Sequence, residues 1–171
     1  NVPIINAGDG AGEHPTQALL DLFTIKNELD CIDGLRVAMV GDLRYGRTVH
    51  SLTQLLSQYD VSLRYVSPET LRLPMELMNM LIDKGIDVRE SHKIEDVIDT
   101  ADVLYVTRIQ KERFSDITQY EEVKNFFVVD EELLKKAKGK MIVMHPLPRV
   151  NELDYRVDKD PRAAYFRQVQ N

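Results

Sequence analysis

Four short stretches of this 171-residue chain hold the side chains that could do chemistry on a small polar substrate. They are His14-Pro15-Thr16-Gln17 and residues 41–48, 107–113 and 145–149, and all but the first contain arginine. A guanidinium group binds a carboxylate through two parallel hydrogen bonds, and imidazole and amide groups can donate to a carbonyl oxygen. The formal net charge is −6, but a few converging arginines can still form a local positive pocket for an anionic substrate.

His14 and Gln17 stand at the start of the first expected helix. A histidine at a helix N-terminus is a good donor toward a carbonyl oxygen, because the helix dipole disfavours a second proton on the ring. Gln17 follows one turn later, so both side chains can address one small planar group, and its amide can donate and accept. The alternative is a capping arrangement in which Thr16 or Glu13 satisfies the helix start. The pattern alone leaves both interpretations open.

Residues 41–48, Gly-Asp-Leu-Arg-Tyr-Gly-Arg-Thr, follow an apolar strand and open a helix. Their spacing nearly matches a phosphate-binding loop, with Arg47 in the place of the motif's lysine, so one hypothesis is a nucleotide-binding module. Asp42 would put a negative charge near the phosphates, and no acidic magnesium-binding strand end accompanies the loop. A second interpretation is a tight turn that requires two glycines. A third places Arg47 at the helix start, where it can bind a carboxylate.

The other two stretches each follow an apolar strand. Arg108 and Gln110 are two residues apart and share a side if the strand geometry continues, whereas residues 111–113 have the pattern of a solvated charge run. Pro146 and Pro148 end sheet pairing after His145 and leave backbone carbonyl groups available to a ligand. The four histidines show no metal-ligand spacing, so we expect no metal site.

The elements that must position these residues alternate along the chain. Apolar segments predict buried strands at 36–40, 63–66, 103–106, 126–129 and 141–144. Helical periodicity predicts helices at 15–28, 46–58, 74–84, 95–100, 130–138 and 162–169. This order predicts an α/β fold, a three-layer αβα sandwich with a mainly parallel, Rossmann-like sheet of about five strands. Residues 41–47, 107–113 and 145–149 would then meet at the carboxyl ends of the strands, where such folds build their sites.

Composition limits the class of protein. The length suits one domain, and 43% hydrophobic residues suffice for a core without disulfide bonds, which a single cysteine could not form within the chain. No stretch approaches a membrane span, and the acidic balance argues against nucleic-acid binding. We therefore expect no nucleic-acid or membrane partners, and the single cysteine is compatible with a reducing, cytoplasmic compartment.

Together, the motifs resemble the aspartate carbamoyltransferases (aspartate transcarbamoylases). The resemblance covers nearly the whole chain in the right order, and it implies that residues 1–171 are the aspartate/ornithine-binding domain of a catalytic chain. The segments that carry it are Asn6-Ala7-Gly8-Asp9-Gly10, His14-Pro15-Thr16-Gln17, Val40-Gly41-Asp42, Gly46-Arg47-Thr48-Val49-His50-Ser51, residues 107–113, residues 145–152 and residues 160–168.

The resemblance implies an enzyme that transfers a carbamoyl group from carbamoyl phosphate to L-aspartate, giving N-carbamoyl-L-aspartate and phosphate in pyrimidine biosynthesis, with no metal or organic cofactor. His14 would donate to the carbamoyl oxygen. Gln17 would hold the carbamoyl amino group together with the backbone carbonyls of Pro146 and Leu147. The family's pattern also implies a cis Leu147-Pro148 bond and a tie between Arg113 and the partner domain. The site is completed by two arginines for the aspartate carboxylates and an assisting amide: Arg47, Arg108 and Gln110.

An ornithine-type carbamoyltransferase is the nearest alternative. That enzyme shares the His-Pro-x-Gln element but typically carries His-Cys-Leu-Pro where this chain has His145-Pro146-Leu147-Pro148. It also lacks the arginine-rich stretch at 107–113. Two arginines suit a substrate with two carboxylates, whereas ornithine has one carboxylate and an amine, so the chemistry favours aspartate.

The family's carbamoyl-phosphate domain carries a Ser-Thr-Arg-Thr element, which this sequence does not contain. We therefore expect that domain and the family's C-terminal helix to be missing from the chain. The resemblance also implies a homotrimer whose active sites borrow residues from a neighbouring subunit. On these grounds the 171 residues alone should fold but should have no appreciable transferase activity.

Overall fold

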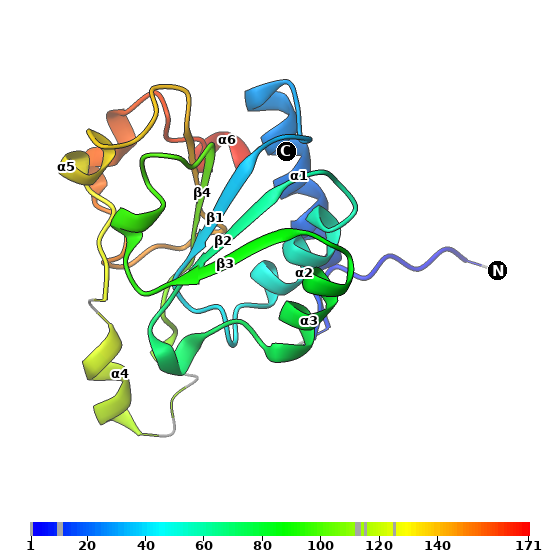
Figure 1. The fold of residues 1–171 in the computed structure, drawn as a ribbon, viewed down its shortest axis with the longest axis horizontal. Helices are drawn as coiled ribbons and strands as arrows, with labels where there is room; N and C mark the ends of the chain where they lie inside the picture. Colours follow the sequence, from blue (N-terminus) through cyan, green and yellow to red (C-terminus); the bar gives the residue numbers. More distant parts are fainter. Residues whose placement is uncertain (1, 10–11, 112–113, 115, 125) are drawn as a thin grey trace.

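The computed structural model describes residues 2–9, 12–111, 114, 116–124 and 126–171. Its centre is a five-stranded parallel sheet in the order β3-β2-β1-β4-β5 (Figure 1). The predicted α/β class, the parallel sheet and the number of strands are confirmed. The strands are β1 (Arg36–Val40), β2 (Ser62–Val66), β3 (Asp87–Ser91), β4 (Val103–Val106) and β5 (Ile142–Met144).

The central strands are apolar on both faces because both faces are covered. Successive side chains of a strand point to opposite sides, so Val37 and Met39 enter one hydrophobic core while Ala38 and Val40 enter the other. All four side chains are fully buried. The sheet is therefore the middle layer of three.

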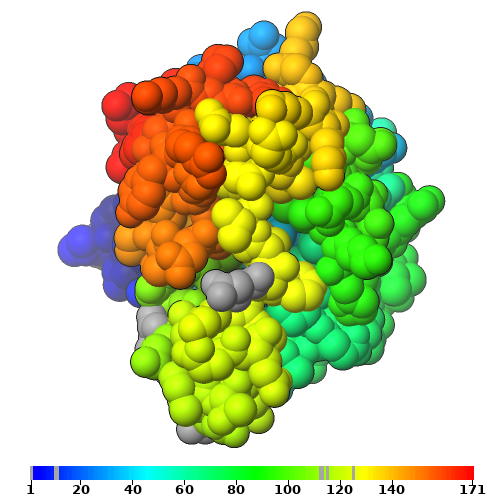
Figure 2. All heavy atoms as spheres, turned by 90° about the vertical axis from the view of Figure 1, so that its left-hand side faces the viewer, coloured from blue at the N-terminus to red at the C-terminus, as the bar shows by residue number. Residues whose placement is uncertain are grey.

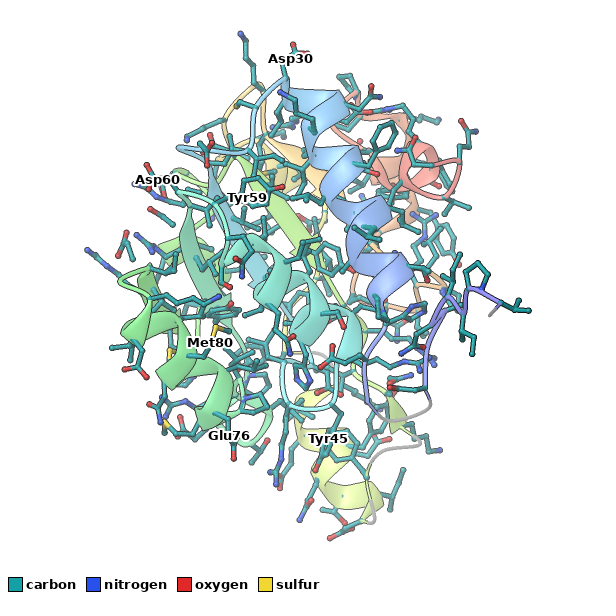
Figure 3. The ribbon with its side chains drawn as sticks, turned by 90° about the vertical axis from the view of Figure 1, so that its right-hand side faces the viewer. Asp30, Tyr45, Tyr59, Asp60, Glu76 and Met80 are labelled. Atoms are coloured by element: carbon teal, nitrogen blue, oxygen red, sulfur yellow. The ribbon has the colours of Figure 1, made fainter. Side chains whose placement is uncertain are left out.

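Helices α1 (Pro15–Leu29), α2 (Arg47–Leu56) and α3 (Met75–Asp83) cover one face and lie side by side, as Figure 3 shows. Proline at the first turn of α1 fits a position whose N–H has no helical partner. Ile25 of α1 and Leu52 of α2 are fully buried against the sheet. These two helices carry the predicted residues His14, at the N-cap of α1, and Arg47, the first residue of α2.

The opposite face is covered by short elements and irregular chain. They are the 3-10 helices η2 (Ile94–Asp96) and η4 (Tyr155–Lys159), and the helices α5 (Glu131–Leu134) and α6 (Tyr165–Gln168). A short 3-10 helix, η1 (Glu69–Leu71), precedes α3. Helix α4 (Ile117–Val123) projects from the body and is solvent-exposed over most of its length (Figures 1 and 2).

Several predicted boundaries were wrong. Residues 126–129 form no strand among the described residues; Val129 instead makes an isolated bridge with Leu153 outside the sheet. The fifth strand is β3, a sheet-edge strand whose mostly polar, exposed sequence lacks an apolar signal. The predicted helix at 95–100 is the 3-10 helix η2, and those at 130–138 and 162–169 shorten to one turn each. Helix α4 was not predicted.

Within the described residues, no helix is both long and apolar enough to cross a membrane.

Candidate active site

The candidate site lies where the strand order reverses. From β1 the sheet continues to β2 and β3 on one side and to β4 and β5 on the other. Val40 and Val106, the last residues of β1 and β4, are register partners, so the loops that follow them start side by side. Such a switch point is where parallel sheets of this type bind ligands, because the two loops leave in opposite directions and open a crevice.

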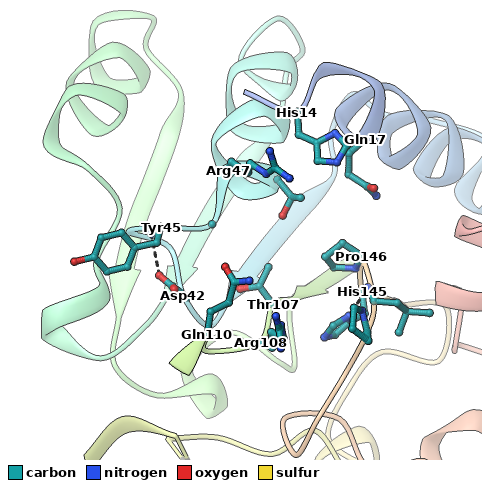
Figure 4. Close-up of a pocket in the computed structure, with 14 residues that line it drawn as sticks. His14, Gln17, Asp42, Tyr45, Arg47, Thr107, Arg108, Gln110, His145 and Pro146 are labelled. Atoms are coloured by element: carbon teal, nitrogen blue, oxygen red, sulfur yellow. Dashed lines mark hydrogen bonds between the residues drawn. The ribbon is translucent and has the colours of Figure 1, made fainter. Parts of the chain in front are cut away.

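A cavity of about 230 Å³ occupies this crevice (Figure 4). Its walls come from the start of α1, from the loops after β1, β4 and β5, and from the first turn of α2. The predicted convergence of three loops at one sheet edge is therefore confirmed. The lining residues are His14, Gln17, Asp42, Tyr45, Gly46, Arg47, Thr48, Thr107, Arg108, Gln110, His145, Pro146, Leu147 and Pro148.

All seven residues that the sequence assigned to the site line this one cavity: His14, Gln17, Arg47, Arg108, Gln110, Pro146 and Leu147. Their individual roles remain predictions. Lys111 is exposed, in keeping with its interpretation as a solvated charge, and Glu112 and Arg113 lie outside the described residues. The sequence analysis assigned no role to Tyr45, Thr48 or Thr107, although their place in the singled-out loops was a usable signal.

Both glycines of the 41–48 loop are required by close backbone approach. Gly41 has φ +124°, and a Cβ at this position would lie 2.1 Å from the carbonyl oxygen of Thr107. A Cβ at Gly46 would lie 2.3 Å from the carbonyl oxygen of Asp42. The tight-turn interpretation of the two glycines therefore holds, because side chains would collide with backbone at both points.

The same loop is poorly suited to hold a nucleotide. A phosphate-binding loop presents its backbone N–H groups to the phosphates. Here the N–H groups of Leu43, Tyr45 and Arg47 donate within the protein: to the carbonyl of Leu71, to Asp42 Oδ1 and to the carbonyl of Tyr45. The Tyr45–Asp42 bond is 2.9 Å long and is drawn in Figure 4. These three donors are therefore committed within the protein, and Arg47 at the start of α2 is the cation that the loop brings to the cavity.

The start of α1 is fixed to α2 by a set of hydrogen bonds. The backbone N–H of His14 donates to Ser51 Oγ over 2.9 Å, Ser51 donates to Glu13, and Gln54 Nε2 donates to Glu13 Oε1 over 3.0 Å. Glu13 thus contacts α2, and the N-cap residue His14 makes no side-chain capping bond. The helix start therefore serves to hold the His14 ring beside the first turn of α2.

His14 lies in a setting that keeps its ring neutral. Burial lowers the pKa of the imidazole below its ordinary value of 6.5, and the positive charge of Arg47 lowers it further. Its Nδ1 atom is buried, and no hydrogen-bond partner for it is found among the described residues. A neutral imidazole near a fixed cation can donate one hydrogen bond to a substrate oxygen without losing its proton.

Gln17 points toward the cavity from α1 and is bonded to a buried carboxylate behind it. Its Nε2 donates to Asp21 Oδ1 over 2.9 Å. Asp21 is fully buried and also accepts from Tyr105 Oη at 2.7 Å and from Gln168 Nε2 at 2.6 Å. Burial raises the pKa of Asp21 to about 6, although all three hydrogen bonds act to lower it.

The loop after β5 is built around the buried ring of His145. Its Nε2 lies 2.9 Å from Glu152 Oε1, and its Nδ1 accepts from the backbone N–H of Leu147 over 2.8 Å. Burial acts to raise the pKa of Glu152, but hydrogen bonds from His145 and from backbone N–H groups hold that pKa below its ordinary value. Leu147 has φ +52°, and the Leu147-Pro148 bond is cis, as predicted.

Comparison of the sequence with known protein families agrees with this geometry. Residues 33–171 match the family described as aspartate/ornithine carbamoyltransferase, Asp/Orn binding domain, and residues 1–27 match the carbamoyl-P binding domain of the same family. The first match covers more than half of the chain. The chain belongs to the aspartate/ornithine carbamoyltransferase family.

Similar proteins include a multifunctional protein and two proteins named as aspartate carbamoyltransferase or aspartate transcarbamoylase. The chain is 58% identical over 169 residues to the multifunctional protein pyr1-3 of Dictyostelium discoideum, covering 99% of this chain and 8% of that protein. It is 58% identical over 167 residues to the aspartate carbamoyltransferase catalytic subunit of Thermoplasma volcanium, covering 98% and 54%. The crystal structure of aspartate transcarbamoylase from Trypanosoma cruzi with carbamoyl phosphate and aspartate superposes with a TM-score of 0.88 at 46% identity, covering 98% and 54%. The chain thus spans about half the length of a catalytic subunit.

Arg149 does not line the cavity; its contacts stabilise the fold. Arg149 is bonded to Asp158 through both of its terminal nitrogens, and its guanidinium lies 4.2 Å from the centre of the Tyr155 ring. These contacts fix the end of the loop that carries Pro146 and Leu147. The ion pair holds the pKa of Asp158 below its ordinary value.

No group of three or more histidine, cysteine, aspartate or glutamate side chains suited to a metal ion occurs in the part of the chain that the structure describes.

Proposed function

We propose that this chain is the aspartate-binding part of an aspartate carbamoyltransferase, which transfers a carbamoyl group from carbamoyl phosphate to L-aspartate in pyrimidine biosynthesis. The observation that carries the proposal is that Arg47, Arg108, His14 and Gln17 line one cavity at the switch point of the sheet. The Trypanosoma cruzi structure that this chain resembles was determined with both substrates.

Two arginines are the proposed aspartate ligands. Arg47 is the first residue of α2, and Arg108 lies in the loop that follows β4, so two separate segments bring the two cations to the cavity. A guanidinium binds a carboxylate through two hydrogen bonds, which fixes orientation as well as position. Gln110, on the same loop as Arg108, would assist through its amide. The two carboxylates of aspartate thereby orient its amine toward the second substrate.

His14 and Gln17 are the proposed contacts to the carbamoyl group. The aspartate amine attacks the carbamoyl carbon, a new C–N bond forms, and negative charge grows on the carbonyl oxygen. His14, kept neutral by burial and by Arg47, would donate to that oxygen and stabilise the charge. Gln17 and the backbone carbonyls of Pro146 and Leu147 would accept from the carbamoyl amino group. The bond to phosphate oxygen then breaks, and phosphate leaves with the electron pair and takes up the proton that the attacking amine gives up.

Most of the rate enhancement would come from alignment of two bound substrates and from this charge stabilisation. The mechanism uses no metal ion or organic cofactor. We place the reaction in a complete chain that includes a carbamoyl-phosphate domain, working as a cytoplasmic homotrimer without nucleic-acid or membrane partners. The family matches and the 54% coverage of the catalytic subunit support the complete chain, and the net charge of −6 supports the lack of nucleic-acid partners. The homotrimer and the cytoplasmic location rest on the family resemblance alone.

Binding to the chain tests the substrate. In an NMR titration, L-aspartate should shift backbone signals near Arg47, Arg108 and His145, and L-ornithine should shift them less at equal concentration. Saturable shifts of the 41–48 loop with Mg-ATP would instead favour the nucleotide-binding alternative. Larger shifts with ornithine than with aspartate would favour the ornithine-type alternative.

A further inference from the structure

Behind the cavity, one buried carboxylate joins four elements. Asp21, on α1, accepts hydrogen bonds from Gln17 on its own helix, from Tyr105 on β4 and from Gln168 on α6. Gln168 in turn accepts from the backbone N–H of His145, the first residue after β5, over 2.9 Å. Asp21 and Gln168 are both fully buried, and neither lines the cavity.

Asp21 fixes which way two amides face. An ionised carboxylate can only accept hydrogen bonds, so both glutamines must turn their NH2 groups toward it. Gln168 shows the consequence: its Nε2 is 2.6 Å from Asp21, and its Oε1 accepts from the N–H of His145. Gln17 is held in the same sense, with Nε2 on Asp21 Oδ1. Its oxygen is therefore the end of the amide left for a ligand.

The consequence for the cavity is a wall of hydrogen-bond acceptors. Gln17, Pro146 and Leu147 line the cavity, and the last two lie on the loop anchored through Gln168 and His145. In the proposed function the acceptors are the amide oxygen of Gln17 and the backbone carbonyls of the two loop residues. Such a wall accepts hydrogen bonds from an NH2 group, whereas a methyl group of similar size has no hydrogen bond to donate.

We propose that Asp21 is a positioning residue that makes the site select a carbamoyl group over other acyl groups by holding Gln17 with its oxygen toward the substrate. This inference rests on the proposed function, in which Gln17 contacts the carbamoyl amino group. Asp21 itself touches no substrate. It orients Gln17 directly. Through Gln168 of α6 it also helps to hold the loop after β5.

Asparagine is the conservative replacement at this position. Its oxygen can accept from both glutamines, while its NH2 can donate to Tyr105 Oη in place of the bond that Tyr105 now donates. Asp21→Leu is similar in size but accepts nothing, so Gln17 is free to turn. Asp21→Ser, which is too short to reach both amides, is a second loss variant if the leucine chain does not fold.

The matched control is Thr24→Val. Thr24 is fully buried on the same helix, and its hydroxyl donates to the carbonyl of Leu20 and accepts from Asn171. Both of these partners, Leu20 and Asn171, lie outside the group that Asp21 forms with its glutamines and outside the cavity lining. Loss of its hydroxyl therefore reports the general cost of removing a buried polar group from α1.

The experiment uses complete aspartate carbamoyltransferase chains that contain this segment. Their carbamoyl phosphate kinetics are compared with inhibition by acetyl phosphate, which has a methyl group in place of the NH2. In Asp21→Leu or Asp21→Ser we expect kcat/KM for carbamoyl phosphate to fall on the order of tenfold or more, with the acetyl phosphate inhibition constant changed less than about twofold. Asp21→Asn and Thr24→Val should keep the selectivity of the original chain.

A double-mutant cycle separates positioning from structural damage. In a Gln17→Ala background, Asp21→Leu should lower kcat/KM by a much smaller factor than in the original background. The reason is that the amide of Gln17, which Asp21 orients, is already absent. Equal factors in the two backgrounds, or equal losses for carbamoyl and acetyl phosphate, would overturn the role of Asp21. Absence of any transfer to aspartate by the unmodified chain would instead refute the proposed function.

Discussion

The backbone N–H of Leu147 donates to Nδ1 of His145 over 2.8 Å, and this bond defines the protonation of the ring. Because Nδ1 accepts, the ring proton must sit on Nε2, which faces Glu152 Oε1 at 2.9 Å. Both members of the pair are buried. The loop that carries Pro146 and Leu147 is thus held from the inside, by an imidazole that is itself held by a carboxylate.

Removing that carboxylate should destabilise the fold. Glu152→Ala leaves the Nε2–H of His145 and the backbone N–H groups of Val150 and Asn151 without their acceptor. We expect the free energy of unfolding to fall by about 3 kcal/mol in urea titrations. Glu152→Gln keeps an acceptor oxygen for the imidazole and should lose less. Equal losses for the two variants would contradict the hydrogen-bonding role.

Substitution of either cavity arginine should impair the use of aspartate more than the binding of carbamoyl phosphate. In a complete enzyme, Arg108→Ala should raise KM for aspartate on the order of a hundredfold while changing carbamoyl phosphate binding little. Arg47→Lys keeps the charge but loses two-point geometry, so it should also impair aspartate use. Steady-state kinetics with each substrate varied in turn provide the measurement. Equal weakening for both substrates would contradict the assignment.

The buried Asp21 should make stability depend on pH. Its pKa is raised from 3.8 to about 6, so between about pH 4 and 6 the folded state keeps a proton that the unfolded state has lost. The free energy of unfolding therefore falls over this range, and above it the folded carboxylate is ionised. The shift corresponds to a loss of about 3 kcal/mol above pH 6. Asp21→Asn lacks this titration, so its stability relative to the unmodified chain should increase over the same range. A difference that stays constant with pH would refute the shift.

Gly41 should tolerate no side chain. In Gly41→Ala the Cβ would lie 2.1 Å from the backbone oxygen of Thr107, at φ +124°, so we expect destabilisation of more than about 2 kcal/mol. Gly34→Ala has a positive φ but open space, and should cost about 1 kcal/mol. Gly139→Ala has open space and no positive φ, and should cost almost nothing. Thermal or chemical unfolding of the three variants tests this order.

The 171-residue chain alone should fold without transferring a carbamoyl group at an appreciable rate. Its sheet and two cores are contained within the described residues. Residues 33–171 match the Asp/Orn binding domain, whereas the match to the carbamoyl-P binding domain is limited to residues 1–27. A folded chain by circular dichroism with no detectable product is the expected result. Turnover by the pure 171-residue chain would contradict this prediction.

The cavity was predictable because its residues follow apolar strands closely in the sequence. Arg47, Arg108 and Pro146 each stand within a few residues of an apolar strand, and parallel strands place such loops at one edge of the sheet. The edge strand β3 was not predictable in the same way, since its exposed polar side chains carry no signal of burial. Helix α4, with only Val123 buried, likewise shows too little amphipathic pattern.

The support behind the cavity could not be predicted from local sequence. Asp21 meets Tyr105 across 84 positions and Gln168 across 147, and no spacing rule connects residues so far apart. From the sequence alone, an aspartate within a helix is expected to lie on the surface. Only the contacts of α1 with α6 and with Tyr105 of β4 show that this carboxylate is buried and accepts three hydrogen bonds.

The central claim is most directly tested by the product of the complete enzyme. A full-length chain containing this segment is incubated with carbamoyl phosphate and an equimolar mixture of L-aspartate and L-ornithine, and the products are separated and quantified. The account predicts N-carbamoyl-L-aspartate and an equal amount of phosphate, with this product lost in the Arg108→Ala variant. Formation of citrulline in preference to N-carbamoyl-L-aspartate, or no carbamoyl transfer to either amine, would contradict it.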